Sequence, residues 1–168
     1  MSKVAVYTLP FHWSRRVWIT TSLYFVFAVT LVAMQIYLAV THSVTAALGL
    51  LISLPILVAI LIYCEGYSPQ RLEISSEQIT VLRRFNSVVI PRSTIVSITP
   101  IAQADMSWTM TEGACGGLFG FFGTFRNRKL GRFTMYATTM ENLYLIRIAD
   151  GRKVVINCSE PDMLQKIA

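Results

Sequence analysis

The chain has 168 residues, of which 54% are apolar and only 14% are charged, and its formal net charge is +6. Soluble domains carry roughly 25% charged residues, so this composition excludes an ordinary, wholly soluble protein. Its three cysteines, Cys64, Cys115 and Cys158, have the spacing of neither a disulfide framework nor a zinc site. The positive charge favours anionic lipid over nucleic acid as a partner, because the sequence has no long basic run or nucleic-acid motif.

Residues 1–16 form a short segment before the first apolar run. The alternation of Val4, Val6 and Thr8 indicates a short strand, which Pro10 would end. Aromatic and cationic residues then follow together, which is typical of the boundary between water and membrane. We therefore expect four interfacial anchors here, namely Trp13, Arg15, Arg16 and Trp18.

Residues 17–64 contain no Asp, Glu, Lys or Arg. The two apolar runs in this stretch, 17–40 and 46–64, are each long enough for a membrane helix, which needs about 18 or more such residues. Only the short turn 41–45 separates them, so the sequence predicts a transmembrane hairpin of two helices. The first run is longer than the apolar core of a signal peptide, and no small-x-small cleavage site follows it before the second run. We expect a retained anchor.

Inside the predicted hairpin, Gly49 and Ser53 form a small-xxx-small pair, which lets a neighbouring helix approach closely. Gln35 is the strongly polar side chain of the first helix. We expect it to lie near the far interface or to bond across to the second helix, because functional intramembrane sites usually involve ionisable groups. Basic residues stand before the first helix and after the second, and none lies in the turn. The positive-inside rule therefore predicts that both termini are cytoplasmic.

From residue 66 onwards the apolar pattern changes to a period of two, which is typical of strands. Asp150-Gly151 indicates a hairpin turn, while Ser159 and Pro161 indicate the start of a final helix. The sequence predicts a domain over 66–168, built as an all-β curled antiparallel sheet with a C-terminal helix. Its seven expected strands are 71–74, 78–82, 88–90, 95–98, 133–136, 143–148 and 154–156.

Seven strands followed by one helix resemble the pleckstrin-homology (PH) superfold. Three segments are similar to the bacterial PH-domain family: GGLFGFFGTF at 116–125, LGRFTMYAT at 130–138, and VVIN followed by SEPD at 154–162. The resemblance implies a barrel whose mouth is plugged by the C-terminal helix. Members of that family often carry a membrane hairpin ahead of the domain, and the family has no catalytic motif. The resemblance implies a location in the bacterial inner (plasma) membrane.

The segment 113–133 combines six glycines, several phenylalanines and four basic residues. A phosphate-cradling loop fits it poorly, because it lacks both nucleotide-binding glycine patterns. Two interpretations stay open: the phenylalanines fill the core, or aromatic and basic side chains contact the membrane interface. On the second, the membrane-contact loop is Leu118, Phe119, Phe121, Phe122 and Phe125. The headgroup-binding residues are then Arg126, Arg128, Lys129 and Arg132.

The sequence offers no catalytic constellation. His12 and His42 flank a predicted membrane helix, and the acids Asp105, Glu112 and Glu141 are scattered and expected to be solvated. We therefore expect no enzyme activity, metal, cofactor, small-molecule substrate or nucleic acid. The predicted function is a membrane-anchored binding module that contacts anionic lipid headgroups or a protein partner. The alternative is a scaffold or oligomerisation subunit that recruits protein rather than lipid. A small transporter would rest on Gln35 and one helical proline alone.

Overall fold

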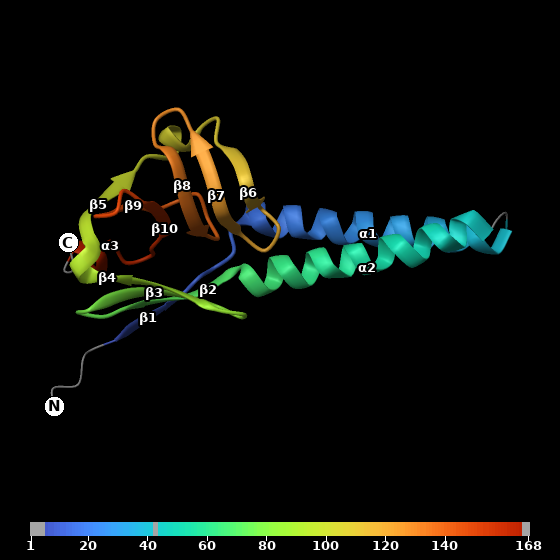
Figure 1. Cartoon of the computed structure of the whole chain (residues 1–168), viewed down its shortest axis with the longest axis horizontal. Coiled ribbons are helices and arrows are strands. Elements are labelled where there is room, and N and C mark those ends of the chain that lie inside the picture. The colour runs from blue at the N-terminus through green and yellow to red at the C-terminus, as the bar shows by residue number, and fades with distance from the viewer. Residues whose placement is uncertain (1–5, 42–43, 166–168) are drawn as a thin grey trace.

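The computed structural model describes residues 6–41 and 44–165. Two long helices, α1 (Arg15–Thr41) and α2 (Val44–Tyr67), lie side by side and project from a β-rich domain (Figure 1). Both are long and apolar enough to cross a membrane, and almost none of their most apolar residues are buried. The helical hairpin covers residues 15–67, so it begins two residues earlier and ends three residues later than the predicted range 17–64. His42 and part of the expected turn lie outside the described residues.

A polar contact joins the two helices. The Ser53 hydroxyl donates a hydrogen bond of 2.7 Å to Oε1 of Gln35. A side chain at Gly49 would begin 3.8 Å from Nε2 of the same residue. Gln35 thus bonds across to α2, which is one of the two positions expected for it. The small residues of α2 lie where this polar side chain crosses, so its amide oxygen has a hydrogen-bond donor inside an apolar pair of helices.

The strands form two sheets. The four-stranded sheet has the order β1-β2-β3-β4, and the six-stranded sheet has the order β5-β9-β10-β8-β7-β6. The strands of the first are β1 (Tyr7–Pro10), β2 (Pro69–Ile74), β3 (Gln78–Arg83) and β4 (Ser87–Pro91). Those of the second are β5 (Ile95–Ile101), β6 (Met110–Gly116), β7 (Phe121–Asn127), β8 (Gly131–Ala137), β9 (Leu143–Ile148) and β10 (Lys153–Asn157). The short helical elements are η1 (Arg92–Thr94), η2 (Gln103–Met106) and α3 (Pro161–Gln165).

Three features differ from the predicted sheet. The described residues form ten strands rather than seven, because β7 and the end of β6 lie in the glycine-rich segment and β1 precedes the hairpin. The two sheets are not closed into a barrel. Strands β8 and β10 pair in parallel, with Val155 opposite Met135, so the sheet is not purely antiparallel. The strand expected around Val4–Thr8 lies at Tyr7–Pro10 instead, and Val4 is outside the described residues.

The hydrophobic core has two parts. One lies between the sheets and includes Leu72, Ile146 and, from α3, the fully buried Leu164. The other covers the opposite face of the six-stranded sheet and includes Phe133 together with Val17 from the start of α1. The helical hairpin is therefore continuous with the core of the β-domain, and α3 packs into that core.

The register between β6 and β7 depends on glycine. Gly123 has a φ of +105°, and a Cβ there would lie 2.7 Å from the Gly113 carbonyl oxygen and from Cα of Ala114. The pairing also shifts between Thr111 and Ala114, as at a β-bulge. A residue without a side chain is required where two backbones approach this closely.

We expect Gly123→Ala to lower the free energy of unfolding by about 3 kcal/mol, because it adds a backbone clash to an unfavourable φ. The matched control is Gly113→Ala, at a φ of +84° with nothing within 4 Å. It should cost only about 1 kcal/mol. Thermal unfolding of the full chain in detergent measures both, and equal shifts in Tm would contradict the packing argument.

Candidate functional site

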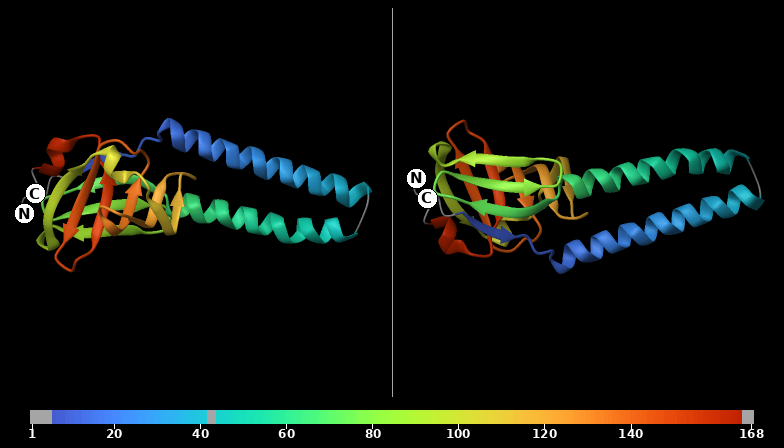
Figure 2. Two further views of the ribbon diagram at one scale, coloured as in Figure 1. Left: turned by 90° about the horizontal axis from the view of Figure 1, so that it is seen from above. Right: turned by 90° about the horizontal axis from the view of Figure 1, so that it is seen from below.

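The turn between β6 and β7, residues 117–120, is called the Gly/Phe turn. It lies at the ends of the two helices that face the β-domain. The backbone N–H of Phe119 donates to Oγ1 of Thr21 in α1 at 3.1 Å. The carbonyl of Phe119 accepts a hydrogen bond of 2.7 Å from the hydroxyl of Ser68, the residue after α2. One turn of the β-domain is therefore held by both arms of the hairpin. Figure 2 shows that these ends of the helices are farther apart than their other ends.

An aromatic cluster surrounds the same contact. The ring of Phe119 lies 5.6 Å from that of Trp13 and 6.4 Å from that of Phe25, both edge to face. Trp13 in turn contacts Trp18 at 5.1 Å. Two of the expected interfacial anchors thus pack together beside the Gly/Phe turn. The other two anchors, Arg15 and Arg16, are exposed at the first residues of α1.

The remaining members of the expected membrane-contact loop are buried. Phe121, Phe122 and Phe125 are 2–3% exposed, and Leu118 is 9% exposed. These side chains have too little exposed surface to contact lipid, which corrects the membrane-contact prediction for these four residues. They fill the core, as the other interpretation of the segment has it. Of the five, only Phe119 reaches α1 as a partly exposed ring.

The four expected headgroup-binding residues gather where β7 turns into β8. We call Arg126, Arg128, Lys129 and Arg132 the basic corner. Arg126 and Arg132 lie opposite each other in the strand register. Like charges in such a pair repel, and Glu112 of β6 offsets the repulsion. Its carboxylate lies 3.1 Å from Nε of Arg126 and 3.4 Å from Nε of Arg132.

Lys129 pairs with Asp105, whereas no ion pair of Arg128 is found among the described residues. Four positive and two negative side chains give the basic corner and its two partners a net charge of +2. Sequence reasoning treated Asp105 and Glu112 as scattered solvated acids, and the fold instead brings both to the corner.

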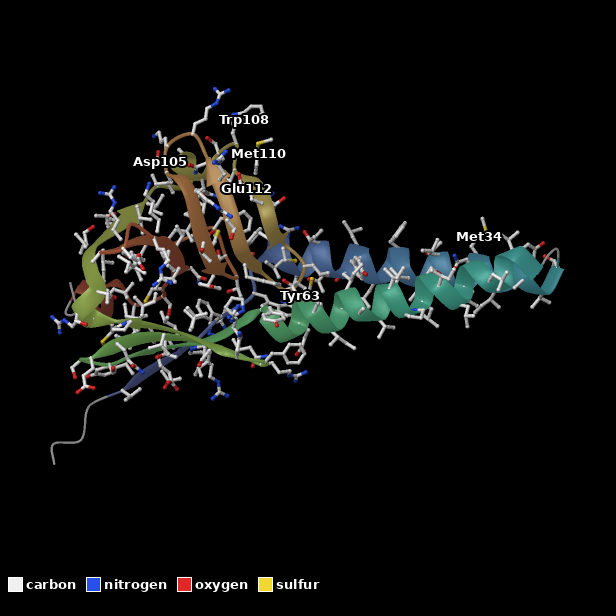
Figure 3. The ribbon with its side chains drawn as sticks, viewed as in Figure 1. Met34, Tyr63, Asp105, Trp108, Met110 and Glu112 are labelled. Atoms are coloured by element: carbon white, nitrogen blue, oxygen red, sulfur yellow. The ribbon has the colours of Figure 1, made fainter. Side chains whose placement is uncertain are left out.

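Two exposed apolar residues that the sequence analysis did not single out lie beside the basic corner. Trp108 is 90% exposed and Met110 is 72% exposed. With Arg126 and Arg128 they line an open hollow of about 710 Å³. Figure 3 shows Trp108 and Met110 at the end of β6 away from α1. The signal that could have found them is a tryptophan in a short polar segment between two strands.

The ribbon views show where β6, the strand that begins beside this hollow, lies relative to the hairpin. Along the long axis of the molecule, β6 lies at the level where α1 begins (Figures 1 and 2). An exposed tryptophan beside basic side chains at this level has the composition of a membrane interface.

Among the described residues, no group of three or more His, Cys, Asp and Glu side chains could hold a metal ion.

Residues 70–167 match the sequence pattern of the family described as "Bacterial PH domain". This match covers 98 of the 168 residues. The chain belongs to the bacterial PH-domain family. The matched part of this PH domain contains the Gly/Phe turn and the basic corner, but neither β1 nor helix α1. PH-like domains are in general non-catalytic binding modules. No curated protein and no solved structure matches the chain.

We expect Thr21→Val to loosen the Gly/Phe turn, because it removes the acceptor of the Phe119 N–H at a site that is 4% exposed. Losing a hydrogen bond of about 1 kcal/mol should speed exchange of the Phe119 amide about fivefold. Hydrogen–deuterium exchange of the full chain in detergent measures this. Thr21→Ser keeps the hydroxyl and should exchange like the wild type. Unchanged exchange in Thr21→Val would show that this bond does not hold the turn.

Proposed function

We propose that this PH domain is a membrane-anchored, non-catalytic module that binds the anionic headgroups of the membrane holding its hairpin. The proposed arrangement has the segment 1–16 and the domain 66–168 in the cytoplasm of a bacterium and residues 17–64 in the inner membrane. The observation that carries the proposal is the exposed corner where Trp108 and Met110 adjoin the basic residues.

The charge of the corner supports a weak contact. Each Lys or Arg near an anionic leaflet contributes about 1 kcal/mol. Four basic residues alone would suggest about 4 kcal/mol, but Glu112 and Asp105 offset two of them, so about 2 kcal/mol is the better figure. Arg128 is the basic residue best placed to meet a lipid phosphate, because it lacks an ion pair in the described structure. Trp108 would add the preference of indole for the interface.

The hairpin makes such a weak contact sufficient. A domain tethered to the bilayer meets its lipids at a high effective concentration, so binding is intramolecular. The hydrogen bonds and rings at the Gly/Phe turn also limit how far the domain can rotate about the hairpin. Small attractive forces then decide which face of the domain turns towards the lipid.

We expect Trp108 to approach the headgroups only when the bilayer is anionic. The measurement uses the full chain with Trp13→Phe and Trp18→Phe, in nanodiscs containing lipid with a nitroxide at headgroup depth. Adding phosphatidylglycerol to phosphatidylcholine should increase quenching of Trp108. The increase should vanish when the basic corner is changed to glutamine, because the net charge of the corner and its two acidic partners then changes from +2 to −2. High salt should also weaken it.

A control with the same change in formal charge separates local contact from general electrostatics. It replaces four exposed arginines elsewhere with glutamine, namely Arg71, Arg92, Arg147 and Arg152. This variant should keep the lipid-dependent quenching. Equal quenching in neutral and anionic bilayers, or equal loss in both variants, would contradict headgroup binding by the basic corner.

The second candidate function is a scaffold that recruits protein, and β6 is the observation that favours it. It is the edge strand of the six-stranded sheet, and its first residues are exposed. An open edge can accept a strand from a partner or a second copy. Lipid-independent shielding of Trp108 that rises with protein density in the bilayer would favour this function over headgroup binding.

The proposed topology has its own test. Thr41 and Ser76 are both exposed, one at the end of α1 and the other between β2 and β3. In intact spheroplasts, Thr41→Cys should react with an impermeant maleimide, while Ser76→Cys should react only after the membrane is opened. The wild-type chain gives the background from its native cysteines. Labelling of Ser76→Cys from outside would overturn the cytoplasmic placement.

A further inference from the structure

Two cysteines from different parts of the chain meet at the junction of hairpin and domain. Cys64 belongs to the last turns of α2, and Cys115 belongs to β6. Their Sγ atoms are 3.6 Å apart, with the Cys64 thiol donating to Cys115. Cys115 also donates to the carbonyl of Leu118 in the Gly/Phe turn at 3.1 Å. The two thiols are therefore held facing each other across the contact that joins the two parts.

We propose that Cys64 and Cys115 are a disulfide-forming pair that, when oxidised, ties the end of α2 covalently to β6. A disulfide requires the sulfur atoms to approach from their present separation to about 2.05 Å. Neither partner lies in a chain end, and both belong to regular elements that already pack together. This proposal is independent of which ligand the basic corner binds.

The oxidant would be a low-molecular-weight disulfide such as oxidised glutathione. The Cys115 thiolate attacks one of its sulfur atoms, so a mixed disulfide forms and one thiolate leaves. Cys64 then loses its proton and attacks the Cys115 sulfur, which releases the second thiolate. The oxidant gains two electrons and both protons and becomes two thiols, while the chain loses two hydrogen atoms.

The surroundings favour Cys115 as the attacking group. The hydrogen bond from Cys64 lowers the thiol pKa of Cys115. Hydrogen bonds from the backbone N–H groups of Leu118 and Gly117 also lower this pKa, whereas burial raises it. Cys115 is also only partly buried whereas Cys64 is buried, so Cys115 is the more exposed residue of the pair. Burial raises the pKa of Cys158, which makes the third thiol the less reactive one.

Oxidation would make the junction rigid. The strand that Cys115 occupies begins at Met110, two residues after Trp108, so the bond would fix the exposed corner relative to α2. In the reduced form, the Gly/Phe turn is held to the helices by noncovalent contacts, namely hydrogen bonds, ring contacts and packing in the core. The pair would thus let the redox state of the surroundings set how freely the domain moves on its anchor.

The test uses the reduced full chain in detergent, equilibrated in buffers of increasing oxidised-to-reduced glutathione ratio. Samples are quenched with acid, alkylated and analysed by peptide mass spectrometry. The expected product is a peptide pair linked through Cys64 and Cys115, with only Cys158 alkylated. The linked form should be reversed by dithiothreitol, and its Tm should exceed that of the reduced chain.

Single variants separate this pair from chance oxidation. Cys158→Ser should give the same linked peptides at the same glutathione ratio. Cys64→Ser and Cys115→Ser should give none and should show no rise in Tm on oxidation. Three free thiols in fully oxidising buffer, glutathione adducts without a linkage, or a linkage through Cys158 would each overturn the proposal. Three free thiols and a linkage through Cys158 would both be detected in the wild-type chain, so these two outcomes test the proposal even if a variant does not fold.

Discussion

The contact of the Gly/Phe turn with the two helices is the constraint on which the arrangement of this protein depends. The chain enters α1 from β1 and leaves α2 into β2, so the β-domain is tied to the hairpin at two points. With two attachment points, the β-domain could still rotate about the line that joins them. The bonds of Phe119 to Thr21 and Ser68 supply a third point and oppose that rotation. The level at which β6 lies along the hairpin follows from this third contact.

The sequence pattern revealed the hairpin, seven of the strands and the final helix, because each of these has a clear period. It missed β6 and β7, since glycine is unfavourable in strands and hides their signal. The pattern failed for a second reason. Phe121 and Phe122 are adjacent and both buried, one in each part of the core. A strand covered on both faces shows no alternation of apolar and polar residues.

The missed strands also explain why the sequence did not show that acidic residues lie beside the basic ones at the candidate site. The basic corner was predicted from its spacing in the sequence. Glu112 could not be assigned to it without knowing that β6 pairs with β7, which brings this carboxylate beside Arg126 and Arg132. Trp108 was overlooked for the same reason, because its position beside the corner depends on where β6 begins. A site made of residues from neighbouring strands needs the strand order before its composition can be read.

A net charge of +2 at the corner is too small for a freely diffusing domain to select a membrane by electrostatics alone. The hairpin removes that requirement, because it would keep the domain beside one bilayer whether or not the corner binds. On the proposed function, the corner therefore serves to sense the composition of a membrane already occupied rather than to find it. A weak contact suits that role, since its strength stays within the range that changes in anionic lipid content can shift. Ion pairing by Glu112 and Asp105 would then be what keeps the contact reversible.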